Sequence, residues 1–144
     1  MKIRPLKKGE EQALSKIVGL NYTREFQRSS VKEFRAMFDN PVIPPTYLVA
    51  EEKDKILGFA GYVQSWMDYH IYEVFWVDVE PARQGQGIGL KLMKRVMSEI
   101  RKKKRTNKAY AVLLTTDKPG FYEKLGFGKL LKVSNYYLMS LNLR

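Results

Sequence analysis

Apolar and polar residues follow two periods along the chain, and the change of period marks the predicted elements. A short strand is expected over residues 2–6. Apolar positions then repeat at helical spacing in residues 9–20, which predicts a first helix. A second helix is expected from Ser30, because Ser30 and Glu33 have the spacing of a capping box. Prolines within residues 40–45 end this helical pattern.

The middle of the chain has the pattern of strands, followed by one long helix. Two apolar runs, residues 46–52 and 55–64, flank a polar turn and predict a β-hairpin. Residues 69–79 are apolar on both faces, as in a central strand. From Ile88 onward apolar residues recur every four positions, which predicts a strongly amphipathic helix.

The C-terminal part is expected to hold a buried strand over residues 109–116, a short helix within 121–127 closed by Gly126, and a last strand over 135–143. The predicted order is β-α-α-β-β-β-α-β-α-β. Hairpins followed by a βαβ crossover predict an α/β class with a mixed, mostly antiparallel sheet. The length of 144 residues fits a single domain over residues 1–144.

Composition removes several kinds of chemistry. The chain has no cysteine and one histidine, His70. These counts exclude disulfides, cysteine nucleophiles and multi-histidine metal sites, so no metal is expected. No apolar run reaches the roughly 20 residues of a membrane span, and the N-terminal residues lack the apolar stretch of a signal peptide. We therefore expect a cytoplasmic protein with no membrane partner.

The formal net charge of +11 favours an anionic partner, although a solvated, lysine-rich surface explains it equally well. The sequence RKKKR at residues 101–105 lies at the end of the predicted long helix, where the helix dipole favours cations. No aromatic residues are interleaved with it. A nucleic acid is therefore not expected as a partner.

The stretch RQGQGIG at residues 83–89 lies between a predicted strand and a predicted helix, which is the arrangement of an anion site. The dinucleotide fingerprint does not fit, because Leu90 stands where its last small residue is needed. A P-loop does not fit either, because no Gly-Lys-Ser/Thr follows the glycines.

The remaining pattern, Gln84-x-x-Gly87-x-Gly89, resembles motif A of the GNAT superfamily of N-acetyltransferases. Pro81 after the sequence VDVE and GFYEKLGF at residues 120–127, which is similar to motif B, extend the resemblance. The predicted element order matches this family over nearly the whole chain. The resemblance implies a GNAT-like fold, acetyl-CoA as co-substrate and direct transfer of an acetyl group to a primary amine.

It also implies a cofactor site. Backbone amides of residues 84–90 are expected at the pyrophosphate, and the strand edge at residues 77–79 at the pantetheine arm. Many members carry an asparagine where this chain has Thr115, so a hydroxyl of Thr115 or Thr116 is the expected substitute. The residues expected to contact the cofactor are Val77, Asp78, Val79, Gln84, Gly85, Gln86, Gly87, Ile88, Gly89, Leu90, Thr115 and Tyr122.

Two side chains are the candidates for acid–base catalysis. Tyr122 matches the motif B tyrosine that protonates the leaving thiolate in many members, and a phenol is protonated at neutral pH. Glu73 lies eleven residues before Gln84, the offset of the general base in related protein-lysine acetyltransferases. Its apolar neighbours partly shield the carboxylate from water. His70 is the alternative base.

The acceptor stays open between a protein lysine, a protein N-terminus and a small amino compound. The resemblance implies that the N-terminal helices and two loops frame it, with Trp66, Met67, Tyr69 and Tyr136 as candidate walls. The chain is expected to be a monomer or a homodimer. The alternative function is a non-catalytic CoA-binding or protein-interaction module on the same fold.

Overall fold

The computed structural model describes Met1–Arg144, and its internal contacts divide the chain into two compact units. The first unit comprises Met1–Val63 and Trp76–Ser98, and the second comprises Gln64–Phe75 and Glu99–Arg144. Strand β4 and helix α3 each contribute to both units. No helix is both long and apolar enough to cross a membrane.

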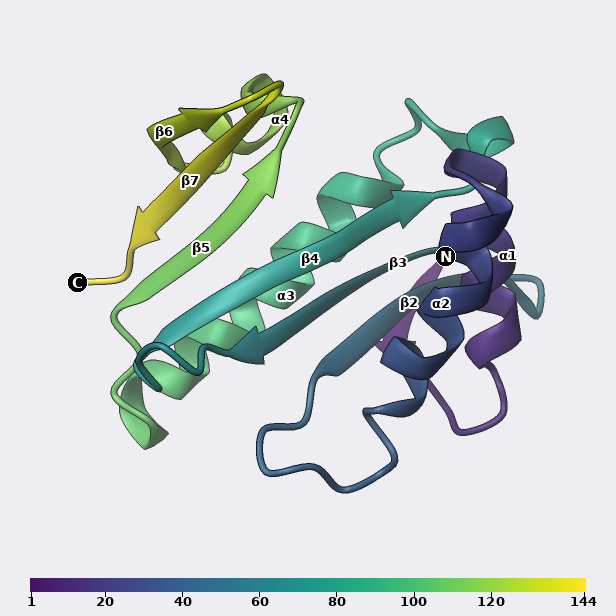
Figure 1. The fold of residues 1–144 in the computed structure, drawn as a ribbon, viewed down its shortest axis with the longest axis horizontal. Coiled ribbons are helices and arrows are strands. Elements are labelled where there is room, and N and C mark those ends of the chain that lie inside the picture. Colours follow the sequence, from purple (N-terminus) through teal and green to yellow (C-terminus); the bar gives the residue numbers. More distant parts are fainter. The chain divides into compact units, whose positions relative to one another are not determined.

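Seven strands, four α-helices and one 3-10 turn follow one another along the chain (Figure 1). They are β1 (Lys2–Pro5), α1 (Glu11–Asn21), α2 (Arg24–Arg35), β2 (Thr46–Glu52), β3 (Lys55–Gln64), β4 (Ile71–Val79), η1 (Pro81–Arg83), α3 (Ile88–Thr106), β5 (Ala111–Thr116), α4 (Pro119–Glu123), β6 (Gly128–Val133) and β7 (Tyr136–Asn142). The strands are hydrogen-bonded in the order β1-β2-β3-β4-β5-β7-β6. Because β4 and β5 are parallel and β1-β2, β2-β3, β5-β7 and β6-β7 are antiparallel, the predicted mixed α/β class is confirmed.

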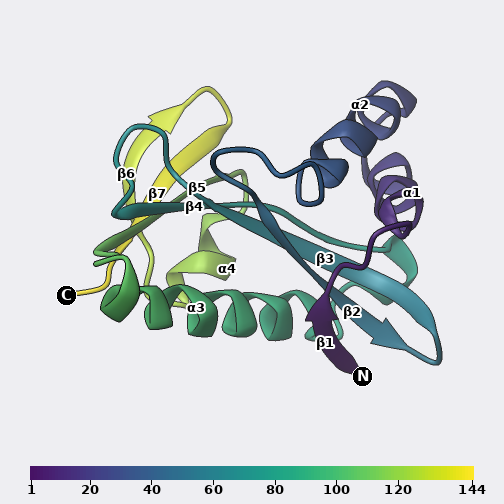
Figure 2. The same ribbon diagram turned by 90° about the horizontal axis from the view of Figure 1, so that it is seen from below.

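In the first unit, β1, β2 and β3 form an antiparallel meander, and helices α1 and α2 lie side by side (Figure 2). The β2–β3 turn uses Lys53 and Asp54, which both have positive φ angles as two-residue hairpin turns require. Phe34 from α2 is fully buried and packs edge-on against the rings of Tyr47 and Phe59. This aromatic group joins the helices to the meander.

The start of α2 differs from the predicted capping box. The helix begins at Arg24, and the side chain of Thr23 accepts the capping hydrogen bond from the Phe26 amide at 3.2 Å. Ser30 lies inside the helix, where its hydroxyl bonds the Gln27 carbonyl and the Ser15 hydroxyl of α1. The prediction was wrong because a serine hydroxyl can find hydrogen-bond partners inside a helix or between two helices, and not only at a helix cap.

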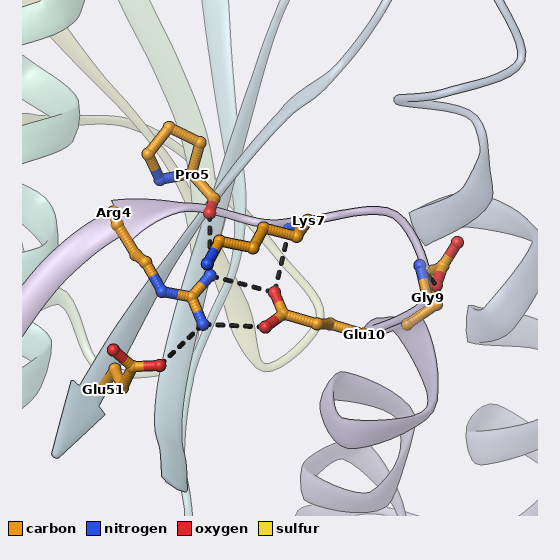
Figure 3. A network of polar contacts seen from close by, with 7 residues as sticks. Arg4, Pro5, Lys7, Gly9, Glu10 and Glu51 are labelled. Atoms are coloured by element: carbon orange, nitrogen blue, oxygen red, sulfur yellow. Dashed lines mark hydrogen bonds and ion pairs between the residues drawn. The ribbon is translucent and has the colours of Figure 1, made fainter. Parts of the chain in front are cut away.

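The N-terminal end of the first unit is held by the buried guanidinium of Arg4 (Figure 3). Its two terminal nitrogens lie 2.9 and 2.8 Å from the two carboxylate oxygens of Glu10, and one of them also contacts Glu51 at 2.8 Å. Glu10 in turn accepts the amide of Lys7. One side chain thereby ties β1 to the start of α1 and to β2.

The second unit contains a hairpin that the sequence pattern missed. Strand β6 pairs with β7 through a tight turn at Ser134, which has a φ of 57°. Every residue of β6 is exposed, so no burial pattern marks it. The observed order therefore has seven strands and not six. The predicted short helix α4 is present, and Gly126 at a φ of 97° ends its last turn as expected.

Candidate functional site

The glycine-rich loop of the first unit joins β4, through η1, to the N-terminus of α3. Gly85 and Gly87 have φ angles of 79° and 84°, which residues other than glycine seldom adopt. A Cβ atom at either position would have no neighbour within 4 Å. These glycines are therefore required by the backbone conformation of the loop and not by close packing inside the protein. The space beside them is open.

The loop presents unpaired backbone donors. Hydrogen bonding within the chain resumes at the Lys91 amide, which donates to the Gly87 carbonyl at 3.1 Å. The amides of residues 85–90 have no acceptor within the chain. They stand at the positive end of a helix of 19 residues. Loop and helix together form a site suited to a phosphate or pyrophosphate group.

The side chain of Gln84 connects the start of this loop to the ends of β4 and α1. Its amide nitrogen donates to the Val79 carbonyl and to Asn21 Oδ1, both at 3.0 Å. The Asn21 side chain, at the end of α1, donates to the same Val79 carbonyl at 3.0 Å. The donor of Gln84 is thus used within the protein, and its expected cofactor contact is left to the backbone.

The end of β4 is irregular where residues 77–79 were expected to meet the pantetheine arm. Trp76 has a φ of 52°, a strained value for a bulky residue in a strand. Asp78 is only 6% exposed, and its carboxylate accepts a hydrogen bond from the Tyr22 hydroxyl at 2.9 Å. A contact between Asp78 and a cofactor would therefore involve its backbone.

In the second unit, Glu73 is the last residue of β4 that pairs with β5, opposite Leu113. Val74 and Phe75 follow without a partner on β5, so the two parallel strands separate directly after Glu73. The Glu73 side chain is half-exposed and makes no hydrogen bond or ion pair within the protein. Its carboxylate oxygens are therefore not engaged by other groups of the protein.

His70 is engaged elsewhere. Its Nδ1 lies 3.1 Å from Asp68 Oδ1 in the β3–β4 turn, and its ring stands 5.7 Å from that of Tyr110. The Tyr110 hydroxyl donates to the other oxygen of Asp68. This hydrogen bond lowers the pKa of Asp68 and raises the pKa of Tyr110. Since His70 belongs to this turn, Glu73 is the better-placed candidate base.

The motif B tyrosine lies in α4. Tyr122 is nearly buried, at 9% exposure, and its ring packs edge-on between Phe121 and Phe127. On β5, the Thr116 hydroxyl accepts the Lys118 amide at 2.9 Å, whereas the Thr115 side chain is exposed. Of the two threonines, Thr115 is therefore the one whose hydroxyl stays available.

The aromatic residues proposed as walls of an acceptor slot do not gather in one place. Asp68, in the turn that carries Trp66, Met67 and Tyr69, bonds Tyr110 at the start of β5. Tyr136 begins β7, and the next residue pairs with Thr116 at the end of β5. The five residue steps from Ala111 to Thr116 separate these places by roughly 17 Å. That expectation was wrong because the sequence does not reveal which strand ends meet.

A mixed sheet with an amide-lined glycine loop at a helix N-terminus places the chain in the class of anion-binding α/β proteins. The sequence pattern of the Acetyltransferase (GNAT) domain family matches residues 44–129, more than half of the chain. The chain therefore belongs to the GNAT family of acetyltransferases, which are acyltransferases. No curated protein matches it.

Solved structures agree with this fold. A protein from Desulfovibrio desulfuricans assigned to the GNAT family superposes with a TM-score of 0.84 at 18% identity, over 99% of each chain. An aminoglycoside 6'-N-acetyltransferase complexed with coenzyme A gives 0.79 at 20% identity, over 100% of this chain and 98% of that one. The PaiA N-acetyltransferase of Thermoplasma acidophilum, in complex with coenzyme A, gives 0.76 at 17% identity, over 98% of each chain.

Proposed function

We propose that this chain, as one catalytic domain, moves the acetyl group of acetyl-CoA directly to a primary amine. The observation that carries the proposal is the run of unpaired backbone amides at residues 85–90. Two of these residues, Gly85 and Gly87, have no side chain, and the space beside them is open. A pyrophosphate fits this row of donors. The coenzyme A bound in two structural neighbours supports the same choice of co-substrate.

In the proposed reaction, the amine nitrogen attacks the thioester carbonyl carbon and the carbon–sulfur bond breaks. Glu73 takes the proton that the amine loses, and Tyr122 gives its hydroxyl proton to the departing thiolate. An amide at the end of β4 donates to the carbonyl oxygen as negative charge develops there. The separation of β4 from β5 after Glu73 supports this arrangement, because it frees strand amides for such contacts.

The acceptor amine is best sought on proteins or small amino compounds. Three structural neighbours are aminoglycoside 6'-acetyltransferases, from Enterococcus faecium in one case. A net charge of +11 repels polycations such as aminoglycosides. We therefore infer that the acceptor of this chain is not a polycation.

Calorimetric titration with acetyl-CoA, followed by an acceptor screen, tests the proposal. Tyr122→Phe is expected to bind acetyl-CoA normally and to lose about 100-fold in transfer rate, the usual contribution of a general acid. Full activity of this variant would remove Tyr122 from the reaction. Binding of acetyl-CoA by the wild type without transfer to any amine would favour the alternative, a CoA-binding module without catalysis.

The base assignment has its own test. Glu73→Gln keeps the size of the side chain and removes its ability to accept a proton. We expect a lower rate and a flatter rise of the rate with pH, while the affinity for acetyl-CoA is unchanged. His70→Gln is the matched control, and its pH profile should follow the wild type. A pH profile of Glu73→Gln identical to that of the wild type contradicts the assignment.

A further inference from the structure

One strongly charged part of the second unit has no role in the proposed transfer. Residues 101–108, called the basic segment below, contain six cationic side chains and no acidic one. All six except the half-buried Lys103 are exposed. Cations at a helix C-terminus are favoured by the dipole within the last turn only, and this segment extends past the end of α3 at Thr106.

The sequence around the basic segment lacks aromatic residues, but the fold supplies them from a distant stretch. The β3–β4 turn, residues 65–70, carries Trp66 and Met67, each 74% exposed, and Tyr69, 52% exposed. Large apolar side chains clustered at such exposure mark interaction surfaces in soluble proteins. We call this stretch the aromatic turn.

The aromatic turn is held rigidly by its own hydrogen bonds. The Ser65 amide donates to the Ile71 carbonyl at 2.8 Å, and the Ile71 amide donates to the Asp68 carbonyl at 2.9 Å. The Met67 amide donates to the Ser65 hydroxyl at 3.1 Å. The backbone that carries the exposed rings is therefore ordered, which lowers the entropy lost when the turn binds a ligand.

The aromatic turn and the basic segment are connected through residues 109–110, just before β5. The Tyr110 amide donates to the His70 carbonyl at 2.9 Å, and the Ala109 amide donates to the Lys103 carbonyl at 3.3 Å. The Asn107 side chain reaches the Tyr72 hydroxyl at 3.0 Å, just beyond the turn. Figure 1 shows the end of α3, the β3–β4 turn and the start of β5 at the same end of the sheet, and Figure 2 shows that the turn rises on the side of the strands away from α3.

An open cleft of about 580 Å³ adjoins the turn. It is lined by polar groups of several kinds, among them His70, Ser140, Asn142 and Arg144 around the Tyr110 ring. The Arg144 guanidinium stands over that ring at 5.3 Å from its centre. The cleft thus combines an aromatic face, a cation, neutral hydrogen-bonding groups and the carboxylate of Asp68, which is bound by the Tyr110 hydroxyl.

We propose that the aromatic turn, the basic segment and this cleft form a binding surface for single-stranded nucleic acid. Cations bind the phosphates, and exposed rings stack on bases, which is how sequence-tolerant single-strand sites work. A duplex fits less well, because it hides the faces of its bases. An anionic membrane fits less well, because the hydrogen-bonding groups of the cleft, such as Ser140 and Asn142, match the edges of unpaired bases.

The test measures binding of labelled single-stranded oligonucleotides of about 12 nucleotides, both RNA and DNA, by fluorescence anisotropy at several salt concentrations. Lys102→Gln/Lys104→Gln is expected to weaken binding and to reduce the salt slope by about 1.4, because each single-strand phosphate contact contributes about 0.7. Trp66→Ala is expected to weaken binding about tenfold, the contribution of a stacked base. Trp66 fluorescence should fall when the oligonucleotide binds.

The matched control is Lys8→Gln/Lys53→Gln, which removes the same charge from exposed positions of the first unit. It should bind as the wild type does. Equal losses in both double variants, or no loss in Trp66→Ala, would reduce the effect to general electrostatic attraction and overturn the proposal. So would binding to vesicles of anionic phospholipid without binding to the oligonucleotides. These outcomes do not depend on acetyl transfer, so they leave the proposed function untouched.

Discussion

At the scale of single residues, the glycine loop is held by the side chains of Gln84 and Asn21. Gln84 and Asn21 both donate to the Val79 carbonyl, and Gln84 also donates to Asn21. These three contacts join the end of α1, the end of β4 and the start of the loop. The loop backbone is therefore positioned by helix α1 as well as by its own glycines.

The first prediction concerns this connection and rests on the proposed binding of acetyl-CoA. Asn21→Ala removes a donor and an acceptor, so the loop is held less firmly and the amides are less well ordered for a pyrophosphate. We expect acetyl-CoA to bind about 3- to 10-fold more weakly, the value of one or two neutral hydrogen bonds. Calorimetric titration measures the change.

The Gln84→Ala variant should show a similar loss, and the double variant should lose little more, because the two side chains act as a unit. Gln12→Ala is the control, since Gln12 is exposed on the same helix. Additive losses in the double variant would show that Asn21 and Gln84 act separately and would contradict this account.

At the scale of elements, the close approach of β3 to β4 is set by a glycine. A Cβ atom on Gly58 would lie 2.8 Å from the Asp78 carbonyl oxygen and 3.2 Å from a Val79 methyl. The first of these contacts is with backbone, which cannot rotate away. Gly58 therefore allows the two strands to approach at the part of β4 that leads into the loop.

We accordingly expect Gly58→Ala to lower the free energy of unfolding by about 1–3 kcal/mol, the usual cost of overpacking. Gly120→Ala is the matched control, because a Cβ atom there meets nothing within 4 Å and alanine favours the helix that contains it. Urea denaturation of both variants measures the difference. A Gly58→Ala protein as stable as the wild type would mean that the strands separate at no cost.

The elements also show what a sequence can predict. The loop at residues 84–90 was predictable because glycines, a strand and an amphipathic helix each leave a local pattern. Strand β6 was not, because all its residues are exposed and its turn uses Ser134, a residue type that seldom takes a positive φ. The roles of Asn21 and Gln84 were also hidden, since 63 positions separate them along the chain.

At the scale of the whole molecule, the excess of positive charge determines how the acidic side chains are bound. The chain carries 26 cationic and 15 acidic side chains, so the acidic ones are outnumbered and several are bound by cations or by hydrogen bonds. The Arg4 guanidinium holds the pKa values of Glu10 and Glu51 below the ordinary range, mainly by hydrogen bonding. Arg83 does the same for Glu52, and the Tyr110 hydroxyl does so for Asp68.

These shifts predict how stability depends on pH. A carboxyl group whose pKa is lower in the folded state than in the unfolded chain stabilises the fold above its unfolded value, here 4.5 for Glu10. That contribution is lost as the pH falls through the folded value. We therefore expect the melting temperature to be steady near neutral pH and to fall below about pH 4.5, where protonation also raises the net positive charge.

The Glu10→Gln variant isolates the part of this loss that belongs to Arg4. At pH 7 we expect it to unfold with about 1 kcal/mol less free energy than the wild type, because a charge-assisted, two-pronged contact becomes a neutral one. The difference should shrink as the pH falls from 4.5 through the lower pKa of the folded state, where the wild-type carboxyl becomes protonated as well. Denaturation series at several pH values measure both quantities, with the exposed Glu25→Gln as control. A difference between variant and wild type that stays constant down to the lowest pH would show that the charge of Glu10 does not contribute to the stability of the fold.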